Sequence, residues 1–198
     1  MSGRAGERMN KNQMKKLTTL LVAAAAAAIM GCSGGELTDN AAPVQLIATT
    51  SQNLHQISIN GGPGCEESVG TVEFQAIPKN PTNTGNFLDV RVTRYRVSYV
   101  RTDGGTAVPA AYTRSTETLV TAGGGPQSFS SFLILQPGAT NQSPFAALFT
   151  GTGRDPVTQQ PFVRMDVVIE FFGETLGGDN VSATTRFSLD FCYSCDCF

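Results

Sequence analysis

The run Val163-Arg-Met-Asp-Val-Val-Ile-Glu-Phe171, followed after a glycine-rich break by Val181-Ser-Ala-Thr-Thr-Arg-Phe-Ser-Leu-Asp-Phe191, decides the fold of this chain. In both runs apolar side chains recur at every second position, and polar side chains fill most positions between them. A period of two is typical of a strand with one face toward a core and the other toward water. The break contains Gly177-Gly178-Asp179-Asn180, which favours a turn. The two runs therefore predict a β-hairpin.

Further short strands are expected on the N-terminal side of this hairpin. They fall at residues 45–48, 54–59, 71–77, 87–101, 116–121 and 129–135. Within 87–101 the apolar side chains change from even to odd positions near Thr93 and Arg94, which predicts a β-bulge or a switch between sheets. With seven or eight strands, turn signals between them and no helix outside the N-terminal segment, the sequence predicts an all-β fold, an antiparallel sandwich.

The segment Tyr95-Arg-Val-Ser-Tyr-Val-Arg-Thr-Asp-Gly-Gly105 resembles the middle strand and turn of fibronectin type III and related immunoglobulin-like domains. The resemblance implies an immunoglobulin-like β-sandwich, which we place at residues 44–198. Tyr95, Tyr99 and Tyr112 could line a carbohydrate-binding face, but aromatic residues that alternate along a strand more often belong to the core.

Residues 1–31 are typical of a secretion signal. A basic segment with Arg4, Arg8, Lys11, Lys15 and Lys16 precedes the 14-residue apolar run from Leu17 to Met30. This run is shorter than the roughly 20 residues that a membrane-spanning helix needs. The junction Ile29-Met30-Gly31-Cys32 resembles the lipobox of bacterial lipoproteins. The resemblance implies that Cys32 is acylated (diacylglycerol and palmitate) and becomes the mature N-terminus. Residues 32–43 are then a flexible tether, and Ser33 favours the outer membrane of the cell envelope.

The residues after Gly31 carry a net negative charge. Five of the 14 Lys and Arg precede Cys32, whereas Glu7 is the only one of the 16 Asp and Glu that does. The remaining 9 basic and 15 acidic groups are scattered and give a net charge near −6. A scattered acidic surplus argues against nucleic-acid binding. The expected partners are the membrane, through the N-terminal lipid, and an envelope protein or glycan.

Four cysteines remain once Cys32 is acylated: Cys65, Cys192, Cys195 and Cys197. An even number in an exported domain points to disulfides, and four cysteines allow three pairings. Because a Cys195–Cys197 bond closes a very tight ring, we favour Cys65 bonded to one C-terminal cysteine, with the other two joined through Cys192. The alternative is that these four thiols form a tetrahedral zinc site or a redox-active pair.

Catalytic motifs are not found in the sequence. His55 is the only histidine, so a Ser-His-Asp mechanism would rest wholly on it, and no Gly-x-Ser-x-Gly elbow accompanies it. Asp166 and Glu170 share a polar strand face with Arg164, where opposite charges are ordinary neighbours. The sequence therefore predicts a binding or scaffolding protein rather than an enzyme, without a cofactor. The alternative is a redox-active or metal-binding lipoprotein that uses the C-terminal cysteines.

Overall fold

The described part of the chain forms two β-sheets. The computed structural model describes residues 41–50, 56–60, 70–82, 85–150 and 153–193. Within these ranges there are eight strands: β1 (Val44–Thr50), β2 (Gln56–Ser58), β3 (Gly70–Pro78), β4 (Val90–Arg101), β5 (Tyr112–Val120), β6 (Gln127–Phe132), β7 (Phe162–Thr175) and β8 (Asn180–Cys192). The prediction of a β-rich fold with seven or eight strands is confirmed for this part of the chain.

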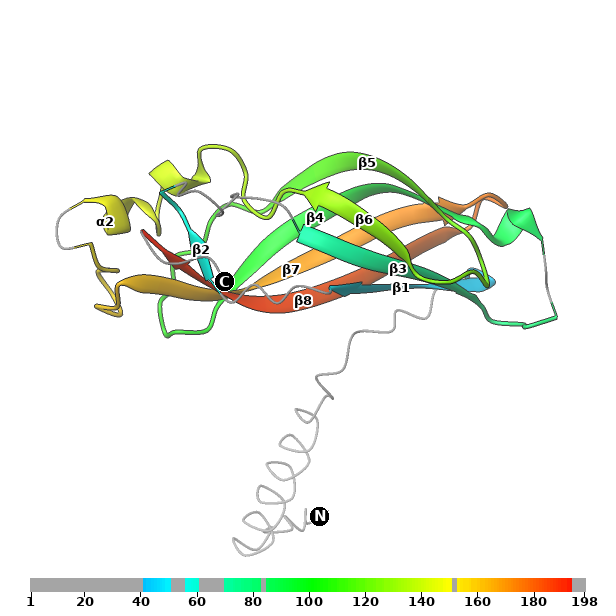
Figure 1. Ribbon diagram of the computed structural model, residues 1–198, viewed down its shortest axis with the longest axis horizontal. Coiled ribbons are helices and arrows are strands. Elements are labelled where there is room, and N and C mark those ends of the chain that lie inside the picture. Colours follow the sequence, from blue (N-terminus) through cyan, green and yellow to red (C-terminus); the bar gives the residue numbers. More distant parts are fainter. Residues whose placement is uncertain (1–40, 51–55, 61–69, 83–84, 151–152, 194–198) are drawn as a thin grey trace, which may run out of the picture. The chain divides into compact units, whose positions relative to one another are not determined.

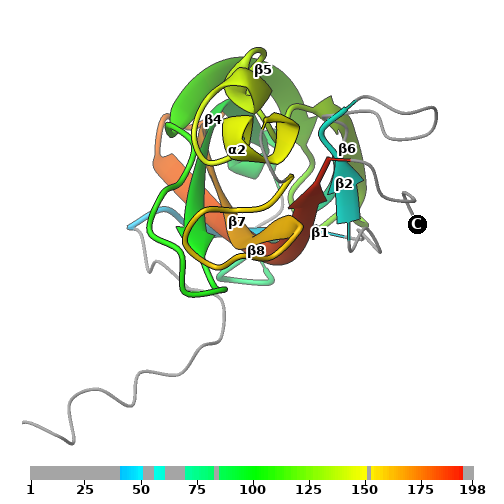
Figure 2. The same cartoon turned by 90° about the vertical axis from the view of Figure 1, so that its left-hand side faces the viewer.

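The strands are ordered β1-β3-β6 in one sheet and β2-β8-β7-β4-β5 in the other. The five-stranded sheet curls into a half-barrel around the core (Figures 1 and 2). Paired strands run antiparallel except β2 and β8, which are parallel. This pair departs from the antiparallel arrangement expected from the sequence. The strand β2 belongs to the larger sheet, whereas its chain neighbours β1 and β3 belong to the smaller one, so β2 makes no hairpin with either of them.

The predicted hairpin is present as β7 and β8, at the centre of the larger sheet. Val167 lies opposite Phe187 and Phe171 lies opposite Ala183. The strands continue past Gly173 as far as Thr175, so the connection is shorter than the sequence predicted. Fully buried side chains cover the inner face of β7: Val163, Met165, Val167, Ile169 and Phe171.

Aromatic rings join the two sheets across the core. The ring of Phe74 on β3 meets the ring of Phe171 on β7 edge-to-face, with 4.8 Å between centroids. Tyr95, Phe129 and Phe132 extend this cluster. Edge-to-face packing places the positive edge of one ring against the negative face of another, which adds to the hydrophobic gain of burial.

The predicted irregularity in β4 is also present. The pairing of β4 with both of its neighbours shifts register between Val92 and Arg94. Val90 and Val92 are buried before the shift, and Tyr95 and Val97 are buried after it. The bulge therefore accommodates one extra residue in β4, so that the apolar side chains after it, now at odd positions, again face the core.

Tyrosine hydroxyls join β4 and β5 of the larger sheet to the segment that directly follows β6 of the smaller sheet. Among the described residues β5 pairs only with β4, and β6 pairs only with β3. Tyr99 Oη donates to the carbonyl oxygen of Ile134 (2.6 Å), and Tyr112 Oη donates to that of Leu133. Tyr95 Oη accepts from the amide of Leu133 (3.2 Å). Tyr95 and Tyr99 are buried, which confirms their assignment to the core, and burial raises the pKa of Tyr99.

The Tyr99→Phe substitution tests this connection. We expect it to lower the free energy of unfolding by about 1–3 kcal/mol, because the buried carbonyl of Ile134 loses its phenol donor. Urea unfolding followed by circular dichroism measures the change. The exposed Tyr193→Phe variant is the control, with an expected change within about 0.5 kcal/mol. Equal urea midpoints for the two variants would contradict the prediction.

Short helical turns occur in the loops. They are the 3₁₀ turns η2 (Asn86–Leu88) and η3 (Ala139–Asn141) and the α-helix α2 (Ala146–Phe149). The sequence predicted no helix here, because one turn of four residues is too short to produce a 3.6-residue period. In the part of the chain that the structure describes, no helix has the length and hydropathy needed to cross a bilayer.

Candidate functional site

A cleft of about 520 Å³ lies at the end of the fold where β4 and β8 end and β7 begins. One wall comes from the connection between β6 and β7, residues 133–161. This connection is far longer than the usual four to six or so residues, and loops of such length are commonly functional. The residues that line the cleft are Gln56, Leu148, Gly153, Pro161, Phe162, Arg164, Asp190, Cys192 and Tyr193.

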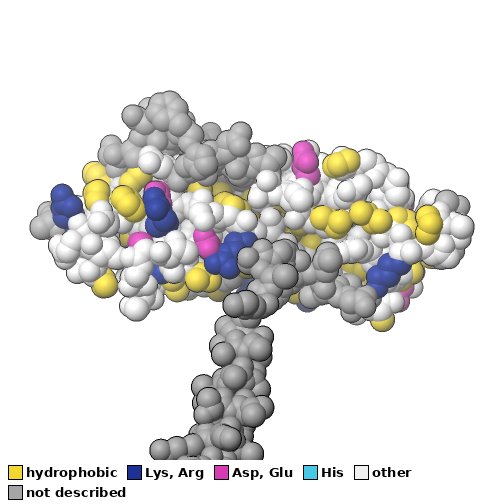
Figure 3. Space-filling model, turned by 90° about the horizontal axis from the view of Figure 1, so that it is seen from below, with side chains coloured by type: hydrophobic (Ala, Val, Ile, Leu, Met, Phe, Trp, Pro, Cys, Tyr) yellow, Lys and Arg dark blue, Asp and Glu magenta, His cyan; other side chains and the backbone are white. Residues whose placement is uncertain are grey.

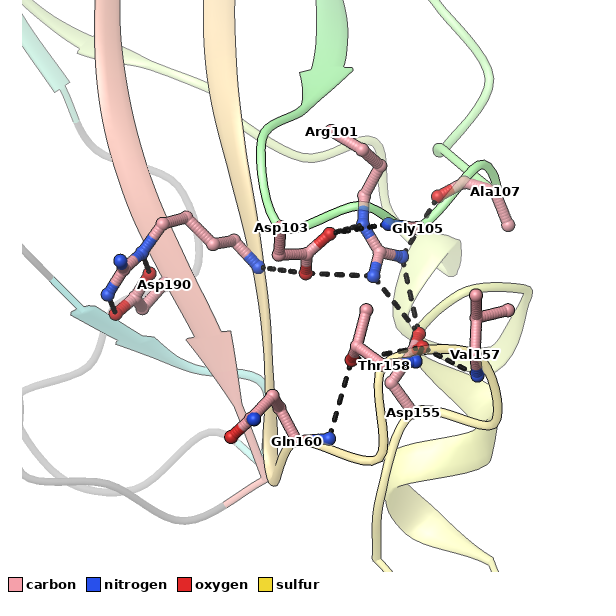
Figure 4. Close-up of polar contacts among 10 residues, drawn as sticks. Arg101, Asp103, Gly105, Ala107, Asp155, Val157, Thr158, Gln160 and Asp190 are labelled. Carbon is pink, nitrogen blue, oxygen red and sulfur yellow. Dashed lines mark hydrogen bonds and ion pairs between the residues drawn. The ribbon is translucent and has the colours of Figure 1, made fainter.

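A charged pair occupies the wall that β7 and β8 provide. Arg164 and Asp190 are directly opposite in the ladder. The guanidinium donates from Nε to Oδ1 (2.6 Å) and from Nη2 to Oδ2 (2.8 Å), a two-pronged contact visible in Figure 4. The guanidinium carbon also lies 5.4 Å from the centre of the Phe162 ring. Two planar polar groups are thus held in one orientation, with Arg164 half-exposed.

Aromatic side chains flank the charged pair. The ring of Tyr193, which follows β8, meets the ring of Phe149 edge-to-face at 4.9 Å. Behind them the buried rings of Phe145 and Phe191 are 5.1 Å apart and join the long connection to the core. The cleft therefore combines an aromatic surface with a fixed polar pair, a combination typical of binding sites.

A buried ion cluster holds the loops beside the cleft (Figure 4). Arg101, at the end of β4, donates from Nε and Nη2 to Asp103 (2.7 and 2.8 Å). Its Nη1 and Nη2 also donate to Oδ2 of Asp155 (3.2 and 3.3 Å). The three side chains are 3%, 8% and 2% exposed. One cation therefore ties the turn after β4 to the long connection before β7.

Backbone amides complete the coordination of both carboxylates. Asp103 accepts from the amides of Gly105 (3.0 Å) and Arg164 (2.9 Å). Asp155 accepts from the amides of Val157 (2.9 Å) and Thr158 (2.8 Å). Burial alone would raise the pKa of each carboxyl, but these hydrogen bonds and those from Arg101 outweigh it and lower both pKa values.

Acid is expected to destabilise the fold through this cluster. Because the folded-state pKa values of Asp103 and Asp155 are lowered, their contribution is complete above the unfolded-state value near 3.8. It is lost as the pH falls through the folded-state values, where both carboxyls take up protons. Urea midpoints measured between pH 7 and pH 2 should therefore fall most steeply below about pH 4. A double Asp103→Asn, Asp155→Asn variant should show a flatter profile, and a profile as steep as the wild type would contradict this assignment.

No protein-family model, curated protein or solved structure matches the chain. Its function is accordingly inferred from the cleft and from the residues around it.

One of the four predicted bonding cysteines lies in the described residues. Cys192 lines the cleft; it is buried, and its Sγ lies 3.7 Å from the carbonyl oxygen of Ile57. Cys32, Cys65, Cys195, Cys197 and His55 lie outside the described residues, as do the signal at residues 1–31 and most of the tether at 32–43. The lipidation, the disulfide pairing and the zinc alternative remain predictions. Within the described ranges no three His, Cys, Asp or Glu side chains are grouped to hold a metal.

The charged groups that shape this end of the fold were not predicted from the sequence. Arg164, Asp166 and Glu170 do share the outward face of β7, as predicted, but each pairs with a residue of a neighbouring strand, and Arg164 pairs with Asp190 across the hairpin. Asp166 instead pairs with Arg186, and Glu170 with Arg96. Extending the predicted hairpin register to its open end would have placed Arg164 opposite Asp190. No local signal connects Arg101 with Asp155, which lies 54 residues away.

Proposed function

We propose that this protein is a lipid-anchored binding or scaffolding module of the cell envelope, without catalytic activity. The acylated Cys32 holds it at the membrane, and the outer membrane is the location that Ser33 favours. The single observation that carries the binding role is the cleft, in which the Arg164–Asp190 pair stands among Phe162 and Tyr193. Its partner is an envelope protein or glycan.

The chemistry of the cleft supports binding over catalysis. Its charged lining residues are already engaged with each other, so neither is poised as a general base or nucleophile. Flat aromatic surfaces and a rigid planar ion pair suit recognition, because they present hydrogen-bonding and stacking groups with little loss of side-chain freedom. The site is built from irregular segments on a rigid sheet, as binding sites commonly are.

The anchor is tested on the full chain produced in a Gram-negative host. We expect incorporation of radiolabelled palmitate and an N-terminal peptide that begins with modified Cys32. The Cys32→Ser variant should incorporate none. A mature protein with an unmodified Cys32 thiol would overturn the lipid anchor.

The binding role is tested by photo-crosslinking in cells. The photoreactive analogue benzoylphenylalanine replaces Tyr193 in the cleft or, as a control, Leu119 at the other end of the fold. We expect a discrete protein or glycan adduct from the Tyr193 position and no protein or glycan adduct from the Leu119 position. The Arg164→Glu substitution should abolish it, because it places two carboxylates in contact. An adduct that forms equally at both positions would contradict a site in the cleft.

The alternative role is a redox-active or metal-binding lipoprotein, and the same experiment tests it and the disulfides. The pairing of β2 with β8 bears on the disulfide of Cys65. Ser58 lies opposite Cys192, and the amide of Ile59 donates to the carbonyl oxygen of Cys192 (2.8 Å). Cys65 follows Ile59 by six residues, a reach of at most about 20 Å. This parallel pairing supports a bond from Cys65 to a C-terminal cysteine.

Intact mass distinguishes the two roles. The exported Cys32→Ser chain should weigh four hydrogens less than its reduced form, with no alkylation before reduction, since two disulfides remove four hydrogens. Alkylation without reduction, or added metal mass under native conditions, would favour the redox or metal role.

The proposal includes an immunoglobulin-like sandwich over residues 44–198. It is supported by the two sheets, which pack on one core.

A further inference from the structure

Exposed apolar side chains occupy the two ends of the fold. At the end with the cleft, among the described residues, they are Val100, Val108, Phe149, Val157 and Tyr193. At the other end they are Ile77, Phe87, Leu119 and Leu176. Figure 3 shows one side of the molecule, on which apolar side chains are visible toward both ends and also between them. Because the cleft belongs to the first end, the second end is the one without an assigned role.

Backbone pairing shows that this second set belongs to one end. Val90, at the start of β4, lies opposite Val120 at the end of β5 and Thr175 at the end of β7. The amide of Gly177 donates to the carbonyl oxygen of Phe87, and the amide of Leu176 donates to the backbone carbonyl oxygen of Asp89, both at 2.8 Å. Phe87 and Leu176 therefore stand on directly connected segments, and they are 52% and 50% exposed.

The described chain also begins at this end. Val44 lies opposite Pro78, and the amide of Lys79 donates to the carbonyl oxygen of Pro43 (2.9 Å). The end of β3 is fixed to the end of β5 because the amide of Gly123 donates to Ala76 (2.8 Å). The first described residues therefore lie at the end of the fold that bears Phe87 and Leu176, and not at the end with the cleft.

We infer that the end bearing Phe87 and Leu176 rests on the lipid bilayer, with these two side chains at the level of the headgroups, while the cleft faces away. The inference rests on the proposed acylation of Cys32. Pro43 follows Cys32 by eleven residues, a reach of at most about 40 Å, and β7, with 14 residues, is about 45 Å long. The end of the fold that bears Phe87 and Leu176 is therefore the end that a lipid on Cys32 brings to the membrane surface first.

The physical chemistry of the two side chains fits this surface. An aromatic ring and a leucine on a loop gain by leaving water for the boundary between headgroups and acyl chains. A lipid at the N-terminus removes most of the entropic penalty of such weak contacts, because the domain is already held at the bilayer. Two modest apolar groups are then sufficient to select one orientation.

The absence of tryptophan from the chain makes the test direct. The full lipidated protein carries Phe87→Trp, Leu176→Trp or, as the control at the opposite end, Val157→Trp, whose native side chain is 60% exposed. Each variant is reconstituted in phosphatidylethanolamine–phosphatidylglycerol vesicles with brominated acyl chains. We expect quenched, blue-shifted emission from the first two variants and unquenched emission from the control.

Each other outcome overturns the inference. Emission that is unquenched in the Phe87→Trp and Leu176→Trp variants, although the protein floats with the vesicles, overturns the orientation and leaves the anchor intact. If the protein does not float with the vesicles, the proposed lipid anchor is overturned, and the proposed function fails with it. A blue shift without vesicles that grows with the concentration of the Cys32→Ser chain assigns this end to self-association instead. Stronger quenching of the control reverses the orientation.

Discussion

Replacing Arg101 by methionine is expected to lower the free energy of unfolding by about 3–5 kcal/mol, the range typical of a buried ion pair that loses one partner. The substitution leaves the carboxylates of Asp103 and Asp155 inside the fold without their shared cation. Their backbone donors remain, so we expect a destabilised fold rather than loss of folding. Chemical denaturation at pH 7 measures the difference.

The matched control is Arg91→Met. Arg91 also forms an ion pair, with Glu174, but both side chains are largely in water. Water and salt screen such an exposed pair, so the control should unfold near the wild-type midpoint. A loss for Arg101→Met no larger than for Arg91→Met would show that the cluster does not stabilise this end of the fold.

The Gly173→Ala substitution is expected to cost about 3 kcal/mol, the upper end of the usual range for overpacking. Gly173 faces the bulge in β4, and a Cβ there would overlap the carbonyl oxygen of Arg91 and lie 3.0 Å from the Cα of Val92. These neighbours are backbone atoms in the middle of a sheet, so relief requires two strands to separate. Thermal and urea unfolding measure the effect.

Gly125→Ala serves as the control for this substitution. A Cβ at Gly125 would meet no atom within 4 Å. The change should therefore be within about 0.5 kcal/mol of the wild type, as for most surface positions. If the two alanine variants were equally stable, the close approach of β4 and β7 at the bulge would not be a packing constraint.

The sequence predicts the strands best where one face is apolar. The strict alternation along β7 and β8 and the change of phase near Thr93 each correspond to a feature of the sheets. The beginning of β5 was missed because Thr113, Arg114 and Ser115 provide no apolar period in an edge strand exposed on both faces. The parallel pairing of β2 was missed because three residues carry no information on direction.

The site was less predictable than the strands. Its lining comes from β2, the long connection and the ends of β7 and β8, which only the tertiary fold brings together. Cys192 was singled out for its chemistry, and it does line the cleft. The burial of Asp155 could not be predicted, because this residue lies in a segment rich in Gly, Pro and Gln that is typical of a solvent-exposed loop.

The position of β1 has a mechanical consequence. Its first residue, Val44, lies at the end opposite the cleft, so under the proposed function tension between the lipid anchor and a partner bound in the cleft would run along the strands. Such a force pulls β1 lengthwise past β3. The seven residue pairs from Val44 to Thr50 then resist together in shear, whereas a chain pulled from the other end of β1 would unzip them one at a time.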